Sequence, residues 1–149
     1  MDWHHLSLLA LKILAVLVLV ALNGFFVATE FALVKVRLTQ LDPLIARGQR
    51  RARMVQHIVT HLDAYLSAAQ LGITLASLGL GWIGEPIFEE LLQPVFRAFA
   101  VESLTVRKSI AFAVGFTLIT FLHIVVGEQA PKSFAIRRPL ATGLWVAYP

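Results

Sequence analysis

The sequence predicts an all-α membrane protein with three transmembrane helices, the second one short or broken, and a basic amphipathic helix on the cytoplasmic face. Of the 149 residues, 58% are hydrophobic and 15% are charged, whereas soluble domains average about 45–50% apolar and about 25% charged residues. Three apolar segments, at about residues 6–34, 62–83 and 109–127, are long enough to cross a hydrocarbon core of ~30 Å. Residues 1–149 are therefore expected to form a single transmembrane domain with the lipid bilayer as its partner.

The first apolar segment carries polar residues that share one side of the expected helix. Asn23 and Glu30 are seven residues apart, so they fall on one face, and Thr29 adds a hydroxyl oxygen nearby. A carboxylate and two neutral oxygens are ligands that suit a hard cation such as magnesium or sodium. The alternative for Glu30 is a salt bridge with Lys35 or Arg37, which begin the following basic loop.

The second apolar segment is rich in small residues, which allow close approach of membrane helices. Gly72 and Ala76 have the four-residue spacing of such contacts, as do Ser77 and Gly81. Glycines cluster towards its end and Pro86 follows, so we expect the segment to be short or broken, as a helical hairpin or re-entrant turn. Gln70, in its middle, offers an amide oxygen as a further ligand.

The third apolar segment ends in a carboxylate followed by a helix breaker. Gly127 relaxes the backbone and Pro131 donates no hydrogen bond, so the helix is expected to end or kink around Glu128. A carboxylate beside freed carbonyl groups is a ready ligand set for a hard cation. The alternative is that Glu128 has reached the interface and pairs with Lys132.

The distribution of basic residues predicts the orientation in the membrane. Lysines and arginines gather in the loop after the first segment and again at residues 132–138, whereas the connection between the second and third segments is acidic. The positive-inside rule then places the N-terminus outside and the C-terminus in the cytoplasm. The loop from Thr39 to His61 can form a basic amphipathic helix lying along the headgroups, or it can serve topology alone.

Several other functions are not expected from this sequence. The chain has no cysteine, which removes disulfides and thiolate metal sites. The net charge of +4 is explained by the topogenic loops, so no nucleic-acid partner is expected. The signatures of metalloproteases, serine hydrolases and nucleotide-binding loops are absent from the sequence, so we do not expect an enzyme.

The chain resembles the transmembrane domain of the CorC/cyclin M family of magnesium transport proteins, called hemolysin-like in bacteria. Three stretches carry the resemblance: LNGFFVATEFALV at 22–34, YLSAAQLGITLASL at 65–78 and GEQAPK at 127–132. It implies a homodimer in the plasma (inner) membrane, with a cytoplasm-facing cavity that binds dehydrated Mg²⁺ and exports it, driven by sodium entry. Family members usually continue into CBS domains that bind ATP, so this chain is expected to be a fragment lacking those cytoplasmic domains.

The resemblance also suggests roles for individual residues. Glu128 matches the family's Gly-Glu-x-x-Pro-Lys glutamate, Thr29 stands where many members have serine, and Gln70 stands near their paired asparagines. Gln70 is a departure that lengthens the amide and bears on ion preference. The expected metal ligands are thus Glu128, Thr29 and Gln70, and the expected cavity, sodium-binding or supporting residues are Glu30, Asn23, Lys132, Pro131 and Gly127. The alternative function is a non-transporting sensor or scaffold that dimerises and relays signals to cytoplasmic domains.

Overall fold

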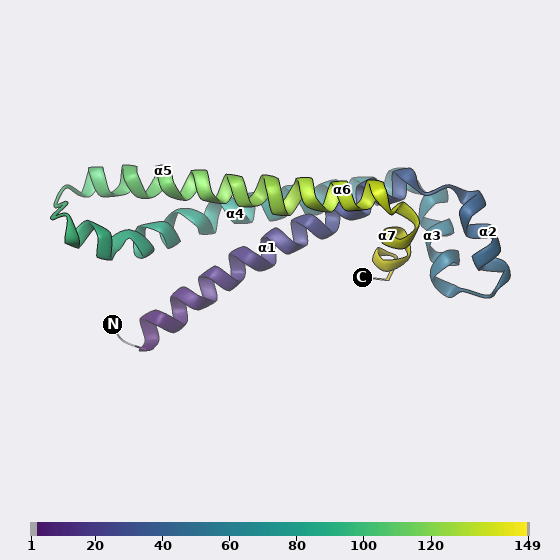
Figure 1. Cartoon of the computed structure of the whole chain (residues 1–149), viewed down its shortest axis with the longest axis horizontal. Helices are drawn as coiled ribbons and strands as arrows, with labels where there is room; N and C mark the ends of the chain where they lie inside the picture. The colour runs from purple at the N-terminus through teal and green to yellow at the C-terminus, as the bar shows by residue number, and fades with distance from the viewer. Residues whose placement is uncertain (1–2, 149) are drawn as a thin grey trace.

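The computed structural model describes residues 3–148, which are helical apart from short connections (Figure 1). Its elements are α1 (Trp3–Lys35), α2 (Leu38–Ala46), α3 (Arg50–Thr60), α4 (Leu62–Ala98), α5 (Leu104–Leu122), the π-helix η1 (His123–Gln129), α6 (Ala130–Arg137) and α7 (Pro139–Val146). By length and composition, the stretches Ser7–Lys35, Leu62–Ala98 and Leu104–Arg137 could each cross a membrane. The predicted fold class, an all-α protein with three spans, is confirmed; the terminal residues 1, 2 and 149 of the predicted domain lie outside the described residues.

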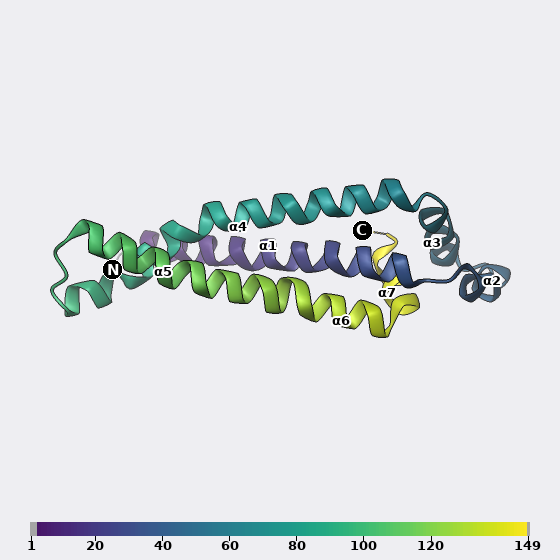
Figure 2. The same ribbon diagram turned by 90° about the horizontal axis from the view of Figure 1, so that it is seen from above.

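The three long helices form a bundle in which α1 packs against α4 and against η1 and α6, while α4 also packs directly against α5. Figure 2 shows α4 and α6 on opposite sides of α1 near α2 and α3, and Figure 1 shows α1 leaving α4 and α5 at an angle towards its N-terminus. Glycines mark the close approaches: a Cβ atom on Gly72 would lie 2.6 Å from ring carbons of Phe26, and one on Gly115 would lie 2.8 Å from the ring of Phe88. The small residues of α4 and α5 therefore serve helix packing, as the sequence indicates for the second segment.

The expectation of a short or broken second span was wrong. Helix α4 runs without interruption for 37 residues and contains both Pro86 and Pro94. Three of its glycines are contact points rather than hinges, because Gly72 faces Phe26 and Gly79 faces Leu19 of α1, and Gly84 faces Ile119 of α5. In a bilayer, a helix keeps most of its backbone groups satisfied internally, so extending it costs less than exposing a turn to lipid.

The predicted amphipathic helix is present as two helices, α2 and α3, separated at Gly48. Gly48 has a φ of 80°, a left-handed conformation that glycine adopts without a steric penalty. The apolar side of α3 packs against the protein: Ala52, Val55 and Ile58 are buried in a cluster with Leu33 of α1, Val36 just after α1, Leu41 of α2, and residues of α7. The basic loop thus caps the bundle and keeps its arginines exposed.

Candidate cation site

The third span changes from an α-helix to a π-helix in the turns before Pro131. Residues His123–Gln129 form a π-helix, and at its end the N–H of Ala130 donates to the carbonyl oxygen of Val125. In an α-helix, the carbonyl of Gly127 would accept from residue 131, but proline has no N–H to donate. The predicted disturbance is therefore present, but the helix widens and continues into α6 instead of ending.

The carbonyl group of Gly127 finds its donor on α1. The side chain of Asn23 is 1% exposed, and its Nδ2 donates to the oxygen of Gly127 at 2.8 Å. A Cβ atom on residue 127 would lie 3.3 Å from that same Nδ2, so a side chain there would crowd the amide. Asn23 Oδ1 is also buried, and within residues 3–148 it has no hydrogen-bond partner. The polar contact thus joins α1 to the π-helix inside an apolar bundle.

A second polar contact joins α1 to α4. Gln70 Nε2 lies 3.5 Å from Glu30 Oε1, at the long limit of a hydrogen bond. Glu30 makes no ion pair with Lys35 or Arg37 among the described residues, so the alternative role considered for it is not observed. Glu30 is partly buried while Gln70 is exposed, which leaves their oxygen atoms accessible from outside the bundle.

The hydroxyl group of Thr29 is committed to its own helix as a donor. Its Oγ1 donates to the carbonyl of Phe25 at 2.8 Å, and Thr74 on α4 makes the equivalent bond to Gln70 at 2.9 Å. A hydroxyl that has used its proton keeps its lone pairs for another partner. Both side chains can therefore act as oxygen ligands but not as donors.

Glu128 is half-buried in the π-helix and does not pair with Lys132. The ammonium of Lys132 instead lies 4.5 Å from the ring centre of Phe31 on α1, which is within the range of a cation–π contact. Among the described residues, no three His, Cys, Asp or Glu side chains gather as a metal cluster, and no hydrogen bond links Glu128, Thr29 and Gln70 to one another. An ion held here would meet isolated carboxylates and neutral oxygens.

Two further polar contacts are not evident from the sequence. Ser77 Oγ lies 3.2 Å from Nε2 of His123 at the start of the π-helix, and Lys12 Nζ lies 2.6 Å from Glu90 Oε2. The sequence shows that all four residues are polar and lie within or beside apolar segments. Which of them meet depends on how the helices are placed against one another, and the spacing within each segment does not give that placement.

Comparison with known proteins gives consistent results. The model of the cyclin M transmembrane N-terminal domain matches residues 13–149. The chain is 52% identical over 132 residues to UPF0053 protein YhdT of Bacillus subtilis, covering 89% of this chain and 28% of the relative. It is 44% identical to UPF0053 protein YugS of the same organism, covering 95% and 33%, and 36% identical to UPF0053 protein sll0260 of Synechocystis, covering 89% and 30%. The chain thus spans about a third of the length of these relatives.

Proposed function

The chain belongs to the family of the cyclin M transmembrane N-terminal domain, and on that premise we propose that it transports a divalent cation, Mg²⁺, across the plasma membrane. The observation that supports this best is the π-helical turn at Gly127 and Glu128, which is held to α1 by the buried Asn23 bond. Placing a charge within a membrane costs roughly 2.5–3.5 kcal/mol on insertion scales, so intramembrane carboxylates usually mark an ion path. Glu30 and Glu128 both lie within candidate spans.

The proposed ligands are Glu128, Thr29 and Gln70. Mg²⁺ takes about six oxygens in near-octahedral geometry and gives up its water reluctantly, so water completes its shell. Thr29 contributes a lone pair because its proton is already donated to Phe25. Gln70 contributes its amide oxygen, since only its nitrogen faces Glu30.

The remaining polar groups support this site. Asn23, with Pro131 and Gly127, fixes the π-helical turn that carries Glu128. Glu30 and Asn23 would line the ion cavity or hold a sodium ion whose inward movement drives export of Mg²⁺. Lys132 stays over Phe31, and so leaves Glu128 free for the ion.

The proposed assembly is a non-enzymatic homodimer with the N-terminus outside and the C-terminus in the cytoplasm. The basic α2–α3 segment lies at one end of the bundle (Figure 1), which agrees with a cytoplasmic placement of that end. The relatives are about three times as long as this chain. Cytoplasmic domains that bind ATP would lie in that additional length.

Ion-dependent thermal stability of the purified protein tests the site. A ligand that binds only the folded state raises stability in proportion to the logarithm of its concentration above its dissociation constant, about 2.7 kcal/mol at a hundredfold excess. We expect MgCl₂ to raise the unfolding midpoint more than CaCl₂ or NaCl, and Glu128→Gln to remove that rise. Glu102→Gln is the matched control, because Glu102 is exposed between α4 and α5.

Each result has a definite reading. Loss of the Mg²⁺ effect in Glu128→Gln, with the control unchanged, would justify measuring Mg²⁺ flux in proteoliposomes. An unchanged Mg²⁺ effect in Glu128→Gln would remove that residue from the site. A folded protein that responds to none of these ions, and proteoliposomes without flux, would favour a sensor or scaffold instead.

A further inference from the structure

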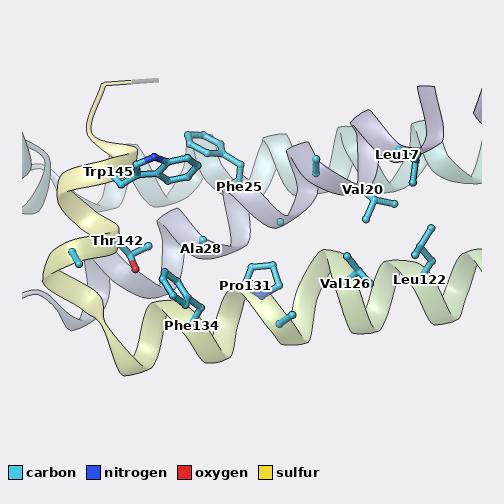
Figure 3. Close-up of a pocket in the computed structure, with 14 residues that line it drawn as sticks. Leu17, Val20, Phe25, Ala28, Leu122, Val126, Pro131, Phe134, Thr142 and Trp145 are labelled. Atoms are coloured by element: carbon cyan, nitrogen blue, oxygen red, sulfur yellow. The ribbon is translucent and has the colours of Figure 1, made fainter. Parts of the chain in front are cut away.

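An apolar groove of about 860 Å³ runs along the side of the bundle. Figure 3 shows it between α1, the η1–α6 rod and α7, with Phe25 and Trp145 at one end and Leu17 and Leu122 at the other. Its walls are almost entirely hydrocarbon. The hydroxyl of Thr142, which also lines it, already donates to the carbonyl of Arg138 at 2.8 Å. An occupant therefore gains apolar contact here but finds no free donor.

The length of the groove matches the depth of one leaflet. On α1 it extends from Leu17 to Ala28, eleven residues apart, which is about 17 Å at a rise of about 1.5 Å per residue. Half of a hydrocarbon core of ~30 Å is ~15 Å. Trp145 and Tyr148, 61% and 57% exposed, lie at the α7 end, and such aromatic residues are enriched at the level of the headgroups.

The α7 end of the groove is also positively charged. Arg137 ends α6 and Arg138 connects it to α7; along the chain both lie between the groove-lining residues Phe134 and Ala141. The guanidinium of Arg51 lies 5.6 Å from the ring centre of Tyr148. All three arginines are exposed, and no described carboxylate pairs with them. Basic pockets between membrane helices at this depth are suited to anionic headgroups.

We propose that this groove is a binding site for an anionic phospholipid. One acyl chain lies along α1 from Ala28 to Leu17, and the phosphate sits at Arg137 and Arg138. The hydrocarbon walls supply affinity for the chain, and the two arginines select a negative headgroup over a zwitterionic one. The site does not depend on the proposed ion transport, because none of the proposed ion ligands lines the groove.

Binding is measured with the purified protein and two lipids that share the same acyl chains, phosphatidylglycerol and phosphatidylcholine. Native mass spectrometry and thermal unfolding both report the affinity. We expect phosphatidylglycerol to bind more tightly than phosphatidylcholine. The double variant Arg137→Gln/Arg138→Gln should weaken phosphatidylglycerol binding by roughly thirtyfold, since each of the two arginines contributes about 1 kcal/mol near an anionic headgroup. The variant Arg47→Gln/Arg53→Gln removes the same charge elsewhere and should leave the affinity unchanged.

A bulky side chain in the groove tests whether the acyl chain of the lipid lies there. Ala21→Phe places a ring inside the groove and should reduce binding of both lipids, whereas Ala113→Phe, at an exposed position of α5 outside the groove, should not. Equal affinity for the two lipids, or full binding in Ala21→Phe, would overturn the proposal.

A cross-linking experiment tests whether a second copy of the protein fills the groove instead. The protein has no cysteine, so single-cysteine variants at Ala21 or Val126 can be cross-linked in vesicles. Efficient cross-linking between two copies there would assign the groove to a protein interface instead.

Discussion

Asn23 donates the hydrogen bond to the carbonyl group of Gly127 that Pro131, which has no N–H, cannot donate. The amide Nδ2 of Asn23 donates to the carbonyl of Gly127 at 2.8 Å, and Gly127 is the residue whose α-helical donor would be residue 131. A defect in one helix is thus repaired by a side chain from another. The geometry of the π-helix and the position of α1 depend on each other for that reason.

Replacing Asn23 should destabilise the protein by leaving the Gly127 carbonyl unsatisfied in the core. We expect Asn23→Ala to cost about 1–3 kcal/mol, the usual penalty for a buried group that loses its partner. Thermal unfolding in detergent measures the loss. Thr117→Ala is the control, because that exposed hydroxyl donates within its own helix to Ala113 at 2.8 Å. Equal stability of Asn23→Ala and the wild type would show that the bond contributes nothing.

Restoring the backbone donor should make Asn23 less important. Pro131→Ala returns an N–H that can reach Gly127, so the cost of Asn23→Ala should be smaller in that background. A double-mutant cycle measures this coupling, expected between about 0.5 and 3 kcal/mol for groups that share a partner. Strictly additive effects of the two substitutions would contradict the relationship.

Gly72 is expected to tolerate no side chain. A Cβ there would lie 2.6 Å from three ring carbons of Phe26, whose ring is itself held edge-on by Phe25 at a centroid distance of 5.5 Å. Overpacking of this kind costs about 1–3 kcal/mol, so Gly72→Ala should lower the unfolding midpoint, and Phe26→Leu should recover part of the loss. Gly81→Ala is the matched control because nothing lies within 4 Å of its Cβ position. If Gly72→Ala is no more harmful than Gly81→Ala, the helices are not in contact there.

Lys12 and Glu90 should behave as a coupled pair. Their side chains are 40% and 29% exposed, and Lys12 Nζ lies 2.6 Å from Glu90 Oε2. The coupling free energy of such a partly exposed ion pair is about 1 kcal/mol or less. We expect Lys12→Met and Glu90→Gln each to lower stability by leaving one charge unpaired, and the double variant to lose less than the sum. Unfolding at two salt concentrations distinguishes this from packing, because screening weakens only the charged pair.

The sequence predicts the elements of this fold better than their extents. Apolar length and small-residue spacing identify the three spans, because those properties are set within each segment. The extent of α4 is mispredicted because Gly84 and Pro86 are ambiguous in a membrane: the same residues break a helix in water and allow close packing in a bundle. The contact of Asn23 with Gly127 spans 104 positions in the chain, and no periodicity encodes such a distance.

Six hydroxyl groups of the helices share one orientation, which bears on the sign of the charge that they can stabilise. Thr29, Ser67, Thr74, Ser77, Thr117 and Thr142 each donate to the carbonyl four residues earlier. Each of these hydroxyl protons is therefore donated within its own helix, and the lone pairs of the oxygen remain available on the outer side. Chloride or phosphate approaching these hydroxyls would meet repulsion without compensation. If the domain transports the proposed cation, these helices would favour it over an anion even where no carboxylate is near.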